Sequence, residues 1–150
     1  MIKFEKSMFI NRPQQEVFDF ATDPANAHKW QSAVKSEKWT SEGPHGVGST
    51  RHVVISGFLG RDTESDLEYT IWDPPNEFYW KGVNGPFPME IGAKCEPKGN
   101  GTQVTVFGQV EPGGFFKLAE GLVKKQIESQ MDSDFEALKQ MLEAVPEKTS

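Results

Sequence analysis

The side chains that could transfer a proton are few and lie far apart in the sequence. The three histidines, His28, His45 and His52, fall in a predicted helix, a loop and a predicted strand, with no His-x-x-x-His or carboxylate spacing beside them. A zinc site needs three or four convergent ligands, so the sequence predicts no metal site. His52 is the only histidine on a predicted sheet strand, which makes it a candidate for a lone base in a pocket.

Alternating carboxylates mark one side of a single predicted strand. Asp62, Glu64, Asp66 and Glu68 share one parity, so they point to the same face. A solvent-facing surface accounts for all four residues. The alternative is that Glu68 turns inward and acts as a general base, with the neighbouring Tyr69 as a further catalytic candidate.

Two further features have the composition of a chemical site but not its context. Cys95 is the single cysteine, so it has no internal disulfide partner, and it is predicted to be a small buried apolar residue. The loop from Gly43 to Gly48 has Gly-x-Gly spacing, but it does not join a strand to a helix as a phosphate-binding loop does. We therefore expect no cofactor.

The composition is that of one soluble globular domain. The chain has 150 residues, 36% hydrophobic and 25% charged. Its net charge of −6 and the absence of a Lys/Arg cluster argue against nucleic acid and against anionic membrane surfaces as partners. No segment has the length of a signal-peptide core or a transmembrane helix. We expect a cytoplasmic monomer or homodimer, with one domain over residues 1–146 and a frayed tail over 147–150.

The longest periodic pattern is C-terminal, from Gly113 to Val145. Apolar residues recur there at intervals of three or four, which places them on one side of an α-helix. They are Phe116, Ala119, Val123, Ile127, Met131, Phe135, Leu138, Leu142 and Val145. Pro146 stops the helix. At 1.5 Å per residue the helix is about 48 Å long, enough to cross a whole β-sheet.

Strands and two short helices precede this long helix. A strand over Ile2–Ile10 is followed by a helix that Pro13 opens, and by a second short helix over Ala25–Gln31. Alternating or β-branched residues between turns rich in Gly, Pro and Asn then predict six more strands. Their ranges are Val34–Thr40, Thr50–Phe58, Thr63–Trp72, Phe78–Val83, Phe87–Cys95 and Thr102–Val110. The predicted class is α+β, with an antiparallel sheet of about seven strands.

Four stretches resemble one known family. The opening from Ile10 to Phe20, followed by Asp23–Asn26 and Trp30, is similar to the start of the polyketide cyclase/dehydrase family. Three further stretches resemble that family's middle turn, last hairpin and closing helix: Asp73–Phe78, Gly99–Val104 and Phe135–Glu143. The family belongs to the START-like, pollen-allergen-like (SRPBCC) superfamily. The resemblance implies a helix-grip fold, in which a curved sheet wraps the long helix around a cavity for hydrophobic small molecules.

The candidate ligand-binding residues follow from where this cavity is expected. The helix from Ile127 to Val145 carries a continuous apolar stripe typical of packed core, whereas the preceding turns are apolar over more of their circumference. We therefore place the cavity beside those turns. The candidates are Trp30, Phe58, Tyr69, Trp80, Met89, Phe107, Phe115, Ala119, Leu122 and Gln126. Gln126 shares one helix edge with Gln130 and Asp134, and for Asp134 we predict a solvated position.

Two main functions remain open at this point. The first is binding or carriage of a hydrophobic small molecule, such as a lipid, an aromatic or polyketide-like metabolite, or an isoprenoid. The second is a cyclase, aromatase or dehydratase that uses the same cavity. A third is a protein-interaction module like the chaperone-activating branch of the superfamily. Convergence of His52, Glu68, Tyr69 and Gln126 on one cavity would favour an enzyme, and the absence of a cavity would leave only the interaction module.

Overall fold

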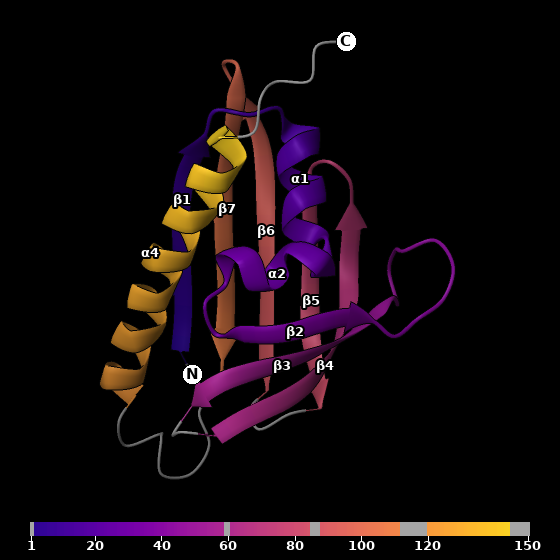
Figure 1. The fold of residues 1–150 in the computed structure, drawn as a ribbon, viewed down its shortest axis with the longest axis vertical. Coiled ribbons are helices and arrows are strands. Elements are labelled where there is room, and N and C mark those ends of the chain that lie inside the picture. The colour runs from indigo at the N-terminus through magenta and orange to yellow at the C-terminus, as the bar shows by residue number, and fades with distance from the viewer. Residues whose placement is uncertain (1, 59–60, 85–87, 112–119, 145–150) are drawn as a thin grey trace.

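The protein is built on a single curved sheet with its helices on one face. The computed structural model describes residues 2–58, 61–84, 88–111 and 120–144. Antiparallel strands follow the order β1-β7-β6-β5-β4-β3-β2, and β2 and β3 run across the direction of β1, β6 and β7 (Figure 1). Their bounds are β1 Ile2–Ile10, β2 Val34–Trp39, β3 Thr50–Phe58, β4 Arg61–Asp73, β5 Glu77–Asn84, β6 Met89–Lys98 and β7 Gly101–Val110.

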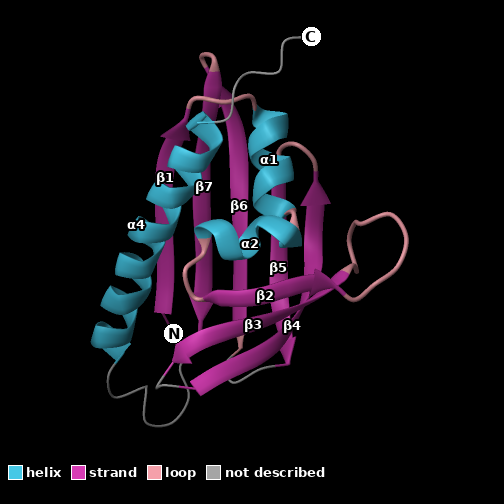
Figure 2. Ribbon diagram, in the orientation of Figure 1, coloured by secondary structure: helices cyan, strands magenta, loops and turns pink. Residues whose placement is uncertain are grey.

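Three described helices cover the concave face of this sheet. They are α1 (Gln14–Thr22), α2 (Pro24–Trp30) and the 25-residue α4 (Glu120–Ala144). Figure 2 shows all of them on the same side of the strands. The predicted helix-grip fold is therefore confirmed. Both ends of the predicted long helix, residues 113–119 and 145, lie outside the described residues.

Small differences from the predicted elements have local causes. Pro13 is the N-cap residue of α1 and not its first helical residue, and Asp23 caps α2 by accepting a hydrogen bond from the Ala25 amide. The β6–β7 hairpin pairs Lys98 with Gly101, so its central residues are Gly99 and Asn100. Gly99 has a φ of +59°, a conformation that favours glycine.

The C-terminal half of α4 closes one end of the molecule, as the apolar stripe predicted. Phe135, Leu138 and Leu142 of α4 are buried. Leu138 and Leu142 belong to one cluster with side chains from β1, α1, β6 and β7, namely Ile10, Val17, Phe18, Cys95 and Val104. This tight packing anchors the helix across the sheet. Within the described chain, no helix combines the length and apolarity that a membrane span requires.

A second, smaller cluster lies under α2 at the other end of the sheet. Ala27 of α2 packs there with Val34, Val53 and Leu67 from β2, β3 and β4. Along α4, Val123, Ile127 and Met131 are only half-buried. The packed core predicted from Ile127 onward is therefore wrong for Ile127 and Met131, which face open space and not the cluster. The two clusters therefore leave a space between the N-terminal half of α4 and the curved sheet.

Candidate ligand-binding cavity

The space between the two clusters is a cavity of about 440 Å³. Its walls come from the three described helices, from the α2–β2 connection and from the concave sides of all seven strands. Most of the lining is apolar, with Trp30, Phe78 and Trp80 among its larger side chains. An apolar cavity with a few placed polar groups is the usual form of a small-molecule site.

A buried ion pair forms one polar group of this cavity. Glu37 Oε1 lies 3.3 Å from Arg51 Nη1, and the two side chains are 7% and 6% exposed. Both residues line the cavity. Burial raises the pKa of the Glu37 carboxyl, and the charge of Arg51 opposes that rise. A carboxyl group beside a guanidinium in an apolar wall is a place where a ligand's polar end can be recognised.

A β-bulge turns Glu37 toward the cavity. Val34 pairs with Ile55, but Ser36 pairs with Val54, so β2 carries one extra residue, Lys35, in this register. After the bulge Glu37 is opposite Val53, which is buried on the concave side. Without the extra residue, the two-residue period of the strand would place Val34 and Glu37 on opposite faces.

Arg51 is held by contacts with residues of α1, β2 and β4. Its Nη1 donates a 2.6 Å hydrogen bond to the Tyr69 hydroxyl, and its Nη2 donates to the Thr22 carbonyl oxygen. The guanidinium lies over the Trp39 ring, 4.6 Å from its centroid. Arg51 Nε is buried and has no hydrogen-bond partner. Burial raises the pKa of Tyr69 to about 12, so this phenol remains a neutral partner.

A second polar group joins α4 to the turn after α2. Asp134 Oδ1 accepts hydrogen bonds from the Ser32 amide and the Ser32 hydroxyl, both at 3.2 Å. Gln130 Nε2 donates to the same hydroxyl. Burial raises the pKa of Asp134, and the bonds from Ser32 oppose that rise. The solvated position predicted for Asp134 is wrong, because the side chain lines the cavity and is bonded across to Ser32.

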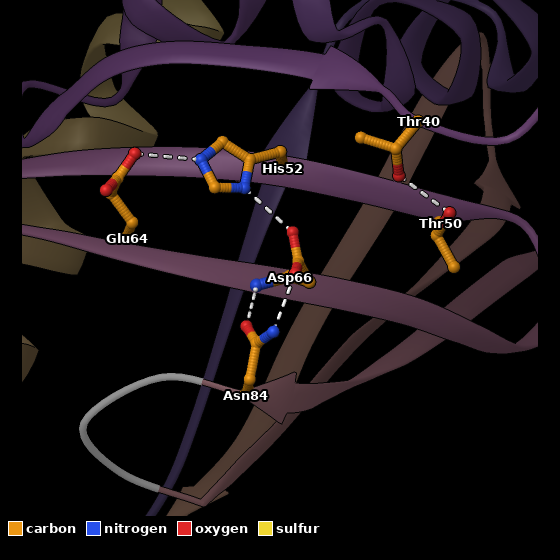
Figure 3. A network of polar contacts seen from close by, with 6 residues as sticks. All are labelled: Thr40, Thr50, His52, Glu64, Asp66 and Asn84. Carbon is orange, nitrogen blue, oxygen red and sulfur yellow. Dashed lines mark hydrogen bonds and ion pairs between the residues drawn. The ribbon is translucent and has the colours of Figure 1, made fainter.

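His52 and Glu68 do not reach the cavity. Arg51 and Val53 take the inward positions of β3, so His52 lies on the outer face (Figure 3). Its Nδ1 is 2.7 Å from Asp66 Oδ1 and its Nε2 is 3.1 Å from Glu64 Oε1. The hydrogen bonds to Asp66 and Glu64 raise the pKa of His52. Glu68 lies 3.9 Å from Lys81 and lines no part of the cavity.

The predicted ligand-binding residues separate into three groups. Trp30, Trp80, Met89 and Gln126 line the cavity, and Gln126 is also exposed, which places it at an opening. Phe115 and Ala119 lie outside the described residues, as does the side chain of Phe58, whose backbone belongs to β3. The third group, Tyr69, Phe107 and Leu122, lies away from the cavity wall. Which of these residues touch a ligand stays a prediction.

The three residues placed elsewhere are Tyr69, Phe107 and Leu122. Tyr69 is fully buried, but it lies behind Arg51 and not on the cavity wall. Phe107 faces outward, where its ring stacks on Tyr79 with centroids 5.6 Å apart. Gly92 belongs to β6, the strand between β5 and β7. A Cβ atom at this position would lie 2.1 Å from the Tyr79 ring. Leu122 is 74% exposed, because it is about 140° around the helix from Ile127.

The residues missed from the sequence are those of the ion pair, Glu37 and Arg51. Each is a single charged residue in a strand that also carries other charges, so neither composition nor spacing distinguishes it. The one available signal was a charged side chain among β-branched neighbours, as at Arg51 before Val53 and Val54. The predicted burial of Cys95 is confirmed, and burial raises the pKa of its thiol to about 12. Within the described residues, no group of three metal-ligating side chains is assembled.

The comparisons with known proteins agree with this geometry. The sequence matches the family described as polyketide cyclase / dehydrase and lipid transport over residues 1–143, so the chain belongs to that family. No curated protein matches the chain. The family resemblance noted in the sequence is thus confirmed.

Solved structures share the fold at low sequence identity. TTHA0849 from Thermus thermophilus superimposes with a TM-score of 0.80 at 20% identity, over 93% of this chain and 96% of that one. A START superfamily protein from Mycobacterium smegmatis has a TM-score of 0.78 at 16% identity, over 95% and 98%. The di-domain ARO/CYC protein BexL of the BE-7585A biosynthetic pathway has a TM-score of 0.77 at 15% identity, and the match covers 96% of this chain and 50% of BexL.

Proposed function

We propose that the protein binds a hydrophobic small molecule in the cavity between α4 and the sheet. The observation that carries this proposal is the apolar-lined space of about 440 Å³ with a single buried ion pair, Glu37 and Arg51, in its described wall. Burial of a ligand's apolar surface contributes roughly 25 cal/mol per Å² before the costs of association. The aromatic lining favours a ligand with a ring system or a flat apolar body.

A cavity-filling substitution tests this proposal. Ile127 of α4 is half-buried and lines the cavity, whereas Leu122 on the same helix is 74% exposed. We expect Ile127→Trp to abolish binding of the neutral fluorescent probe N-phenyl-1-naphthylamine, and Leu122→Trp to leave it unchanged. Titration of the probe with each protein measures the difference. Equal binding by the two variants, or no binding by the unmodified protein, would reject the proposed site.

Catalysis in the same cavity is a second candidate, supported by one observation. Glu37 is a carboxyl in an apolar wall with a raised pKa, a setting that suits a general base or acid. In the dehydration of a β-hydroxy ketone, Glu37 would remove the α-proton and return it to the departing hydroxyl, so that water leaves and a conjugated double bond forms. Absorbance of the enone formed from 4-hydroxy-4-phenylbutan-2-one tests this reaction. A rate equal to that of Glu37→Gln excludes Glu37 as its base.

A further inference from the structure

Glu37 is a carboxylate with unused hydrogen-bonding capacity in the cavity wall. Its contact with Arg51, at 3.3 Å, is an ion pair, and no hydrogen bond to either of its oxygens is formed within the described part of the chain. The buried side-chain atoms that lack a hydrogen-bond partner include Arg51 Nε but neither oxygen of Glu37, so the Glu37 oxygens are not fully enclosed. A ligand in the cavity can therefore reach the carboxylate, while most of the guanidinium is already covered.

The charges of the pair restrict what a ligand can bring to this point. Glu37 and Arg51 both line the cavity and together are neutral, so Glu37 offsets the positive charge of Arg51 there. A ligand carboxylate would add a second anion beside Glu37, and like charges in a partly desolvated site repel strongly. A ligand cation would be repelled by Arg51, whose positive charge offsets the attraction of Glu37. A neutral hydroxyl instead donates a hydrogen bond to a carboxylate that has none.

We propose that Glu37 is the specificity-determining residue of the cavity, which selects neutral ligands that carry a hydroxyl donor and excludes carboxylates by neutralising Arg51. This inference rests on the proposed function, because it concerns ligands of the same cavity. It adds the chemical class of the ligand's polar end and the residue that selects it.

Removal of the Glu37 charge should reverse the selection. In Glu37→Gln, Arg51 keeps its contacts with Tyr69, Thr22 and the Trp39 ring, so its position does not depend on Glu37 alone. Glu37 is its single ion-pair partner among the described residues, so the variant leaves a buried positive charge without a counterion. Such a charge is a site for a carboxylate.

Three naphthalene derivatives of similar size test the proposal. 2-Naphthol is a neutral donor, 2-methoxynaphthalene lacks the donor, and 2-naphthoate is an anion at pH 7. We expect the unmodified protein to bind 2-naphthol at least tenfold more tightly than the other two compounds. Glu37→Gln should bind 2-naphthoate at least tenfold more tightly than the unmodified protein does. The control is Glu68→Gln, which removes the same charge from the outer face and should leave all three affinities unchanged.

The outcomes separate this inference from the proposed function. If N-phenyl-1-naphthylamine binds but 2-naphthoate binds the unmodified protein as well as 2-naphthol does, the cavity is real and the role of Glu37 is wrong. If neither N-phenyl-1-naphthylamine nor any naphthalene binds, both proposals fall. The first comparison needs no variant, so the proposal stays testable even where Glu37→Gln does not fold. Far-UV circular dichroism of Glu37→Gln and Glu68→Gln establishes that each variant is folded.

Discussion

Replacement of Arg51 by methionine should be one of the most destabilising single changes in the protein. The substitution removes the cation that faces Glu37 at 3.3 Å and the donor that bonds the Tyr69 hydroxyl at 2.6 Å. It also leaves the Thr22 carbonyl without its bond from Nη2. Breaking a buried ion pair from one side costs about 3–5 kcal/mol, because the remaining charge stays buried without a partner.

The expected loss can be converted to a thermal shift. Because 1 kcal/mol corresponds to roughly 2–4 °C for a chain of 150–250 residues, about 4 kcal/mol lowers Tm by roughly 8–16 °C. The double variant Glu37→Met with Arg51→Met leaves no unpaired charge. We therefore expect it to be more stable than Arg51→Met alone by more than about 1 kcal/mol, on the order of the coupling between contacting residues.

Urea unfolding followed by circular dichroism measures both variants against the unmodified protein. Lys81→Met is the control, since Lys81 lies 3.9 Å from Glu68 in an exposed pair that should contribute at most about 1 kcal/mol. The reasoning would be refuted by a loss below about 1 kcal/mol for Arg51→Met, which is the range of an exposed pair. It would also be refuted by a double variant no more stable than Arg51→Met, because the cost would then not come from an uncompensated charge on Glu37.

Three further predictions address the core and the dependence on pH. Leu138→Ala should lower the free energy of unfolding by about 2–5 kcal/mol in urea titrations, because Leu138 is 2% exposed in the main cluster. Leu122→Ala, at an exposed position of the same helix, should change the free energy of unfolding little. Similar losses for both variants would contradict the packing described for α4. Burial raises the pKa of Glu37 above its unfolded value of 4.5, so its carboxyl favours the folded state most at pH below 4.5. The stability of the unmodified protein relative to Glu37→Gln should therefore fall as the pH rises from 4.5 through the folded pKa of Glu37. A stability difference that rises with pH would oppose this assignment. The pKa of His52 is raised above 6.5 and that of Asp66 is lowered below 3.8. The stability contribution of their contact should therefore be lost when the pH rises through the folded pKa of His52, and also when it falls through the folded pKa of Asp66. A pH-independent difference in stability between the unmodified protein and His52→Gln would argue against an ionised contact.

Periodicity was enough to predict the elements of this fold. The seven strands and the two short helices differ from their predicted ranges by a few residues at most, because each has a clear period of two or of three to four between turn residues. The stripe on α4 predicted the packing of its last turns, where Leu138 and Leu142 are buried, but Ile127 and Met131 at its start line the cavity. The family resemblance then supplied the way the elements are assembled.

The site was less predictable, because side-chain direction depends on a few irregular positions. Apolar candidates such as Trp30 and Trp80 were chosen from their size and from the cavity that the family resemblance implies, and they line the cavity. Tyr69 and Phe107 have the same character, yet one lies behind Arg51 and the other on the outer face. Composition cannot separate these cases, since a large aromatic side chain can pack in a core, line a cavity wall or stack across strands.

The sequence alone determined the class of protein, since local period and turn chemistry decide which segments become strands and helices. Only the tertiary structure decided the polar chemistry of the cavity. The extra residue in β2 reverses the parity of that strand and brings Glu37 to the concave face beside Arg51. The turn after α2 likewise brings Ser32 to Asp134, which a helical pattern by itself assigns to solvent. Both placements depend on contacts between residues far apart in the chain, and no local pattern encodes those contacts.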